Sequence, residues 1–549
     1  MKAKQVMTSR TDTQSDAFEG INQGSAGLYD IFIIGGGVNG CGIARDAAGR
    51  GLSVMLCEKD DLAQATSSAS TKLFHGGLRY LEYFKFRMVR EALQERETLL
   101  GMMPHIAWPL RFVLPVNRAL HFANDNSALG RILGYIPGLK GRRPAWLTRL
   151  GLFVYDHIGG RRLLPACRTL SLRNHVSGDP LQDQFRLAFE YSDCWVEDSR
   201  LVVLNARSAA MHGADILTRT SFCDARRQNG IWHVQVRDSS GVVREVRAKA
   251  VVNAAGPWAE AVLSGDMRRG NQHGLRLVRG SHIITRRLFD HAQPYFLQLA
   301  DGRIIFAIPY ERNFTLIGTT DVDHDSDPAA ASCSDAERDY LLKAVNGFFK
   351  TQLTVEDVVA SFSGVRPLYD DKAGSAAAAT RDYVLTCEDD AGVAPVLNVF
   401  GGKITTYRRL AEHALEKLAP WFPEMGGHWS DTEALPGGHF QLAERDGLPA
   451  RLMAEHAYLD HDWAERLVRA YGMDAFDMLA GAKDIADLGV CFGGTLHARE
   501  VDWLRQHEWA VTADDILWRR SKLGLVLDDQ AATRLTAWIA NASPVTEVA

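Results

Sequence analysis

A glycine-rich turn near the beginning of the chain has the residue spacing that can hold the diphosphate of a dinucleotide. The pattern G-x-G-x-x-G, at residues 35–40, follows the apolar run 28–34 directly. Glycines at this spacing let backbone N–H groups approach an anion at the start of the following helix. We therefore assign the following residues to a cofactor: Gly35, Gly36, Gly37, Asn39 and Gly40.

The segments around this turn predict the strand, helix and strand that a dinucleotide site needs. Residues 28–34 predict a buried strand, and 41–50 predict a helix with small residues for close packing, ended by Gly51. A second strand, 52–57, runs into Glu58, whose carboxylate can accept hydrogen bonds from ribose hydroxyls. The glycine pattern alone is also typical of a simple tight turn. The complete unit favours a dinucleotide and leaves FAD and NAD both open.

A hydroxyl-rich loop at residues 65–80 is suited to wrapping a second mononucleotide. It runs from serines and threonines into a histidine and a Gly-Gly pair. A solvated linker is the alternative, but linkers rarely lead directly into His, Arg and Tyr at close spacing. Within this loop we assign to the cofactor Thr66, Ser67, Ser70, Lys72, His75, Gly76 and Gly77.

Two later strands also end in small residues. The strand at 250–254 leads into Ala255 and Gly256, and the strand at 396–400 leads into Gly401 and Gly402, followed by Lys403 and Thr405. A helix is predicted after the second strand, up to Pro420. Its N-terminus would stabilise the negative charge on a reduced flavin, which nicotinamide does not require. This feature favours FAD, and we assign the small and polar residues that follow the two strands to the FAD site.

Composition limits the class of protein. With 549 residues, two or three subdomains are expected, and a net charge of -5 argues against nucleic-acid binding. The eight cysteines form no C-x-x-C pair, so neither zinc nor a disulfide framework is indicated. No run of about 18 apolar residues predicts a membrane-spanning helix. The polar residues 1–27 carry no secretory signal, and we expect a disordered extension.

The chain resembles the FAD-dependent sn-glycerol-3-phosphate dehydrogenases of the aerobic respiratory chain. Two stretches carry this resemblance, residues 34–51 and residues 401–411. Shorter stretches between them are also similar to the family, so that the resemblance covers residues 29–420: 72–81, 189–198, 280–284, 317–321 and 361–368.

The resemblance implies an α/β fold and a membrane-linked reaction. The fold would be a glutathione-reductase-like FAD-binding domain at 28–420 with an interleaved antiparallel-sheet substrate domain, roughly 80–165 and 270–370. Residues 430–549 predict a C-terminal helical cap domain. The implied reaction oxidises sn-glycerol 3-phosphate to dihydroxyacetone phosphate and reduces ubiquinone. We expect a homodimer in the cytoplasm or at the cytoplasmic face of the inner membrane.

A phosphorylated polyol needs fixed cations. Arg presents a planar fork to phosphate oxygens, and Lys presents a point charge. Each cation taken alone is also compatible with a surface ion pair, but the set together favours a substrate site. By resemblance, the substrate residues are Arg79, Tyr80, Arg366, Arg381 and Lys403.

Proton removal from the substrate hydroxyl needs a base that titrates near neutral pH. His75 and His282 are the candidates, because imidazole titrates in that range. Lys403 can lower the pKa of the hydroxyl without accepting the proton, and Arg366 completes the catalytic set. The reaction requires no metal, and neither a phosphate-binding P-loop nor a calcium loop is complete in this sequence.

A basic segment at residues 126–178 is a candidate membrane dock. It contains nine basic residues and one acid, a net +8, so the rest of the chain carries -13. Apolar residues alternate with these cations, as in segments that lie on an anionic membrane. The alternative is a basic loop packed against an acidic face. Residues 117–143 also form an insert relative to the family pattern.

Two other functions stay open from the sequence. An oxidase of the same fold would pass the electrons to oxygen, because no motif reports oxygen access. A flavoprotein with a structural or sensing FAD would turn over no substrate. The cation set disfavours the second, and the basic segment favours a quinone over oxygen.

Overall fold

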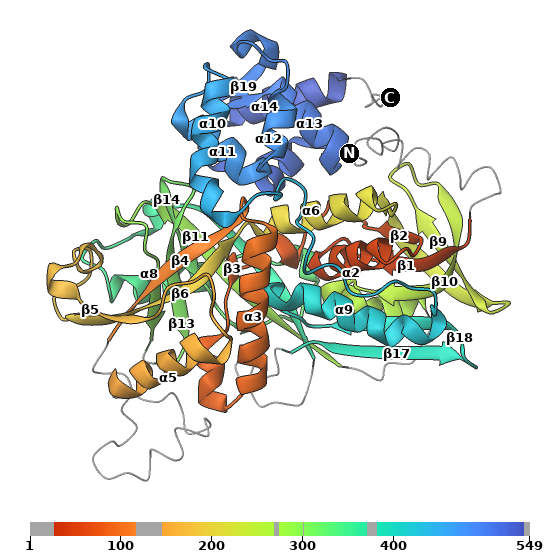
Figure 1. Cartoon of the computed structure of the whole chain (residues 1–549), viewed down its shortest axis with the longest axis horizontal. Helices are drawn as coiled ribbons and strands as arrows, with labels where there is room; N and C mark the ends of the chain where they lie inside the picture. Colours follow the sequence, from red (N-terminus) through yellow and green to blue (C-terminus); the bar gives the residue numbers. More distant parts are fainter. Residues whose placement is uncertain (1–26, 117–144, 268–273, 300, 370–381, 543–549) are drawn as a thin grey trace.

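The computed structural model describes residues 27–116, 145–267, 274–299, 301–369 and 382–542. Two β-sheets, called sheet A and sheet B below, lie beside each other, and a helical C-terminal domain packs across them (Figure 1). The predicted extension 1–27, apart from its last residue, the insert 117–143 and Arg381 lie outside the described residues. In the described part of the chain, no helix combines the length and hydropathy required to cross a membrane.

Sheet A is the predicted dinucleotide-binding sheet. Its central strands pair in parallel in the order β18, β10, β1, β2 and β7, and β17 pairs antiparallel at one edge. Its strands are β1 (Tyr29–Ile34), β2 (Val54–Cys57), β7 (Asp215–Leu217), β8 (Ser221–Gln228), β9 (Ile231–Arg237), β10 (Val243–Asn253), β17 (Val384–Asp390) and β18 (Val393–Phe400).

Three helices cover one face of sheet A. They lie side by side in Figure 1 and are α2 (Val38–Gly49), α6 (Asp198–Met211) and α9 (Tyr407–Leu418). Because parallel strands are buried on both faces, they read as continuous apolar runs, as β1 does. Helix α2 begins before the predicted residue 41 because extended Gly37 serves as its N-cap.

Sheet B contains strands from both ranges predicted for the substrate domain, roughly 80–165 and 270–370, together with β3, β5 and β6 from outside them. Its strands pair antiparallel except for β4 with β12. Helix α8 (Asp335–Asn346) packs on it. Its strands are β3 (Leu73–Phe74), β4 (Ala107–Pro115), β5 (Arg168–Ser171), β6 (Leu187–Val196), β11 (Leu275–Arg286), β12 (Tyr295–Gln298), β13 (Ile304–Tyr310), β14 (Phe314–Gly318), β15 (Val322–Asp323) and β16 (Val358–Tyr369).

The C-terminal domain is helical, as the apolar periodicity indicates. Trp463, Leu467 and Tyr471 lie on the buried face of one helix and contribute to a separate core. Buried ion pairs fasten this domain to sheet A, such as the two hydrogen bonds of 2.7 and 2.8 Å from Arg520 to Asp61. Its helices are α10 (Leu448–Glu455), α11 (His461–Tyr471), α12 (Asp474–Leu479), α13 (Ala498–Glu508) and α14 (Asp529–Asn541).

Candidate active site

The predicted cofactor segments meet at one edge of sheet A. Ile34 pairs with Cys57 on one side and with Asn253 on the other, and Asn253 pairs with Asn398. These parallel strands therefore end at the same level, where the glycine turn, Glu58, Ala255-Gly256 and Gly401-Gly402 follow them. Ligands of open α/β sheets bind at this carboxyl edge.

Close backbone contacts require glycine at two positions of the turn. Gly35 has a φ of 108°, and a Cβ there would lie 2.6 Å from the carbonyl oxygen of Ala254. A Cβ on Gly40 would lie 1.9 Å from the carbonyl oxygen of Gly35. Side chains at either position would push the turn away from its neighbours, so the spacing reflects steric need.

Glu58 lies under the turn. Its carboxylate accepts hydrogen bonds from the N–H of Gly36 at 2.7 Å and of Asp60 at 2.9 Å. Burial raises the pKa of Glu58, although these hydrogen bonds act in the opposite direction. An ionised carboxylate offers about four acceptor positions, so that of Glu58 keeps capacity for further hydrogen-bond donors.

Ser67 and Asn39 connect the turn to the other cofactor segments. The Ser67 hydroxyl accepts the first N–H of α2, from Val38, at 3.0 Å. The Asn39 amide donates to the carbonyl oxygen of Gly401 at 3.1 Å, while its Oδ1 is buried and has no hydrogen-bond partner among the described residues. Buried polar atoms normally have partners, so this acceptor fits a donor from a bound cofactor.

The buried acid Asp198 holds the hydroxyl-rich loop in place. Thr66 donates to the carbonyl oxygen of Val365 at 2.6 Å. Ser70 donates to Asp198 at 2.8 Å, and the Lys72 ammonium donates to the same carboxylate at 2.7 Å. Burial acts to raise the pKa of Asp198, but Lys72 lowers it overall. Sequence reasoning missed Asp198, although it ends the family-like stretch 189–198.

His282 lies on β11 and faces this loop. Its Nε2 is 2.9 Å from the Thr71 hydroxyl, and its ring stacks on Phe362 with centroids 4.9 Å apart. Burial, helped by the charges of Arg366 and Lys72, lowers the pKa of His282 to about 3. The imidazole is therefore neutral at physiological pH and a weak base.

Lys403 and Tyr80, two of the residues assigned to the substrate by resemblance, lie in contact. The Lys403 ammonium lies 3.9 Å from the centroid of the Tyr80 ring, a cation–π contact. Tyr80 belongs to the short helix η2 (Leu78–Tyr83). The side chain of Arg79, on the same helix, lies outside the described residues, as does all of Arg381.

Arg366 lies on β16 and is fixed by the residues that follow β14. It pairs with Asp321, and its other terminal nitrogen donates to the Thr319 hydroxyl at 3.0 Å. Gly280 on the adjacent strand makes room, because a Cβ there would lie 2.3 Å from the guanidinium. The family-like stretches 280–284, 317–321 and 361–368 thus meet around one cation. No pattern in the sequence indicated that Asp321 would pair with Arg366.

His75, Gly76 and Gly77 lie beside the start of α9. The N–H of His75 donates to the Thr405 hydroxyl at 3.3 Å. Gly77 has a φ of 73°, and a Cβ there would lie 2.3 Å from the Tyr80 ring. The candidate base, the Gly-Gly pair and the cation–π pair therefore occupy neighbouring positions.

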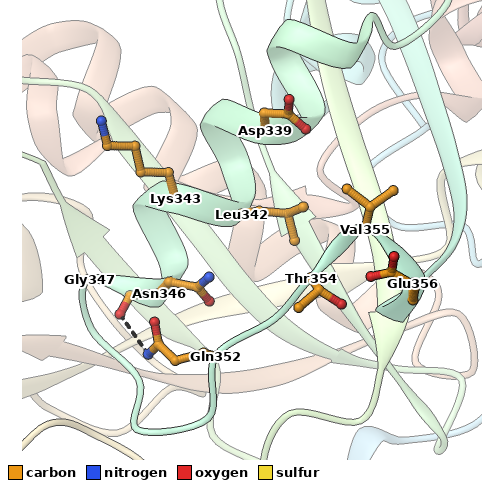
Figure 2. Close-up of a pocket in the computed structure, with 9 residues that line it drawn as sticks. All are labelled: Asp339, Leu342, Lys343, Asn346, Gly347, Gln352, Thr354, Val355 and Glu356. Carbon is orange, nitrogen blue, oxygen red and sulfur yellow. Dashed lines mark hydrogen bonds between the residues drawn. The ribbon is translucent and has the colours of Figure 1, made fainter.

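A surface pocket lies elsewhere, at the C-terminal end of α8. Figure 2 shows its lining, which includes Asp339, Lys343, Gln352 and Glu356, and its volume is about 670 Å³. None of the predicted cofactor or substrate residues lines it.

The chain is similar to known proteins over most of its length. Residues 30–408 match the family model described as FAD dependent oxidoreductase, and residues 429–545 match the C-terminal domain of alpha-glycerophosphate oxidase. Glycerol-3-phosphate dehydrogenase of Pseudomonas aeruginosa is 50% identical over 519 residues, which are 94% of this chain and 96% of the relative. D-erythritol 1-phosphate dehydrogenase of Brucella abortus is 49% identical over 517 residues, 94% and 98% of the two chains.

A solved structure has the same fold. The glycerol-3-phosphate dehydrogenase from Bacillus halodurans complexed with FAD aligns with a TM-score of 0.71 at 24% identity, covering 97% of this chain and 99% of that one. FAD, rather than NAD, is thus the cofactor, and the expectation of a C-terminal helical domain is confirmed. The chain belongs to the FAD dependent oxidoreductase family.

Proposed function

We propose that this enzyme oxidises sn-glycerol 3-phosphate to dihydroxyacetone phosphate and passes the electrons to ubiquinone. The observation that carries the proposal is the position of Lys403. Lys403 comes shortly after the end of β18, where FAD is expected, and its ammonium lies over the Tyr80 ring. A cation held there is suited to an anionic substrate beside the cofactor.

The residues at the carboxyl edge of sheet A fit FAD. Gly35, Gly36 and Gly37 would face the diphosphate, and Glu58 would bind the ribose. The start of α9, after Gly402, would lie near the ring system. FAD supplies the two-electron acceptor, and every other task falls to side chains of this chain.

Lys403 and Arg366 would bind the phosphate and orient the polyol. Arg366 is already restrained by Asp321 and Thr319, so little conformational entropy is lost when it binds an anion. The Lys403 ammonium, supported by an aromatic face, would also stabilise negative charge that develops on the substrate oxygen.

His75 is the preferred proton acceptor. The proton of the C2 hydroxyl would move to the His75 imidazole while the C2 hydrogen leaves as hydride toward FAD, so that C2 becomes the carbonyl carbon. His282 is less suited, because burial and neighbouring cations lower its pKa to about 3. A neutral His282 would instead orient the loop through Thr71.

An exposed apolar surface supports a membrane-bound acceptor. On α5 (Ala145–Ile158), Trp146, Leu150 and Phe153 are 59%, 50% and 52% exposed and lie on one face of the helix. Phe84, at the end of η2, and Phe86 are also exposed, and α5 packs against η2. Scattered exposed apolar residues are normal, but several on one helix face within a basic segment are typical of membrane docking.

D-erythritol 1-phosphate is a second candidate substrate. The relative that acts on it, by its name, is almost as similar to this chain as the glycerol-3-phosphate dehydrogenase. The two compounds share a terminal phosphate and an adjacent hydroxyl, and differ by one additional CHOH group. The cations would bind the phosphate of both, so the space around the end of the polyol away from the phosphate decides between them.

An anaerobic reduction experiment tests this proposal. The yellow protein is mixed without oxygen with sn-glycerol 3-phosphate, D-erythritol 1-phosphate or glycerol, and then with a short-chain ubiquinone or oxygen. We expect bleaching by sn-glycerol 3-phosphate, none by glycerol, and fast reoxidation by the quinone. Faster bleaching by the erythritol compound would change the substrate, faster reoxidation by oxygen would indicate an oxidase, and no bleaching would contradict both enzymatic functions.

A further inference from the structure

A buried tyrosine on α5 holds the backbone of the loop that carries His75. The N–H of Gly76 donates to the Tyr155 hydroxyl at 2.8 Å, and that hydroxyl donates to Asp193 at 2.7 Å. A longer contact of 3.4 Å connects the Gly76 N–H to Asp193 directly. Because this N–H already has partners within the protein, it is not available to a cofactor.

The carboxylate behind Tyr155 is itself fixed by a buried cation. Arg96 on α3 (Phe86–Met102) donates to Asp193 at 2.6 Å and to the carbonyl oxygen of Ser192 at 2.7 Å. Arg96, Tyr155 and Asp193 are each at least 95% buried. Side chains from α3, α5 and β6 thus converge on one backbone amide.

Packing alone does not require a buried ion pair and tyrosine at this place in the core. A buried ion pair costs desolvation energy, and an apolar cluster of similar volume is often as stable. The surrounding core is apolar and would accept such a cluster, since Leu93 and Leu152 pack there. The amide itself is closely surrounded, because a Cβ on Gly76 would lie 2.3 Å from Leu93.

The residues on either side of Gly76 belong to the proposed reaction. The preceding residue is His75, whose N–H donates to Thr405. The following residue, Gly77, lies against the Tyr80 ring that supports Lys403. A shift of the Gly76 peptide would therefore move the proton acceptor relative to the cation.

We propose that Tyr155 is a positioning residue, which uses the Asp193–Arg96 pair to fix the Gly76 peptide and so places His75 and Tyr80 for catalysis. This inference rests on the proposed function. Tyr155 touches neither substrate nor cofactor in this account and acts only through the loop.

The test compares Tyr155→Phe with Tyr191→Phe. Tyr191 is equally buried on the neighbouring strand β6 and contacts the Tyr155 ring edge-to-face, with centroids 6.0 Å apart. For Tyr155→Phe we expect faster hydrogen exchange in residues 73–81 of the full chain. We also expect the anaerobic reduction rate constant, per bound flavin at saturating sn-glycerol 3-phosphate, to fall roughly tenfold with FAD content unchanged.

Tyr191→Phe serves as the matched control and should show neither change. Wild-type exchange and a wild-type rate per bound flavin in Tyr155→Phe would overturn the inference, and so would equal effects in both variants. If Tyr155→Phe does not fold, Arg96→Lys, which loosens the hold on Asp193, must show the same two changes at smaller size. Failure of the wild type to bleach would count against the proposed function alone, because the exchange experiment needs no substrate.

Discussion

The cofactor edge of sheet A and the substrate region beside it are built in different ways. At the cofactor edge, glycines and strand ends bring backbone groups together, and the contacts are between residues fixed by strand register. In the substrate region, the Arg366 side chain is held by Asp321, an acid far away in the sequence. The first region should therefore be sensitive to added volume, and the second to lost charge.

The largest effect is expected at the cofactor edge. In Gly40→Ala the new Cβ would lie 1.9 Å from the Gly35 carbonyl oxygen, which only a backbone shift can relieve. We expect the purified variant to lose bound FAD almost completely, measured by the flavin-to-protein absorbance ratio. Gly101→Ala, on α3 with open space at its Cβ, is the control and should keep wild-type FAD. A yellow Gly40→Ala protein would contradict a backbone-built cofactor site.

The next effect concerns charge in the substrate region. Lys403→Met keeps the length of the side chain but removes the cation over Tyr80. We expect kcat/KM for sn-glycerol 3-phosphate to fall by roughly 100-fold to 1000-fold, on the scale of losing one preorganised electrostatic group. FAD content should remain at the wild-type level. Lys417→Met, on the exposed face of the following helix α9, should retain wild-type kinetics.

A smaller effect should follow when charge is kept and geometry is changed. Arg366→Lys retains the cation, but a lysine cannot reach both Asp321 and Thr319 and still present a planar fork. We expect KM to rise about tenfold with a smaller change in kcat. The control is Arg276→Lys, whose arginine pairs with Asp323 at the surface of the same sheet. If both variants have the same KM, Arg366 does not bind the phosphate.

The smallest effect is a pH dependence of stability. The pKa of His282 is about 3 in the folded protein, below the ordinary value of 6.5, so the unfolded chain binds the additional proton between these pH values. The stability from His282 is therefore present above about pH 6.5 and lost as the pH falls, by about 2 kcal/mol at pH 5. Denaturant titrations of wild type and His282→Gln, above about pH 6.5 and at about pH 5, measure this loss of stability. The variant should lack it. Identical pH dependence in the two proteins would rule it out.

The sequence predicted the cofactor edge more completely than the substrate region. Glycine spacing and strand ends are local signals, and parallel pairing brings Gly35, Glu58 and Gly401 together once the strands are recognised. The partners Asp198, Asp321 and Tyr155 have no local signal, because each acts on a residue many positions away. Arg366 was assigned by resemblance, and no pattern in the sequence indicated that Asp321 restrains it.

The two candidate bases, His75 and His282, show the same limit of prediction from sequence. Residue type left both His75 and His282 as candidates for the base, and the sequence favoured His75 only because it precedes the Gly76-Gly77 pair. Only the fold places His282 in a fully buried position beside Arg366 and Lys72, which lowers its pKa. Burial is a property of the packed core and cannot be obtained from spacing.

Deuterium substitution in the substrate tests whether the C2 hydrogen is transferred to the flavin as hydride. Wild-type protein is mixed anaerobically with sn-glycerol 3-phosphate carrying deuterium at C2 or at C1, and flavin bleaching is followed by stopped-flow absorbance. We expect slower bleaching with deuterium at C2 and an unchanged rate with deuterium at C1, because the C2 hydrogen leaves as hydride. Equal rates for the C2-deuterated and unlabelled compounds, with bleaching limited by the chemical step, would contradict hydride transfer from C2.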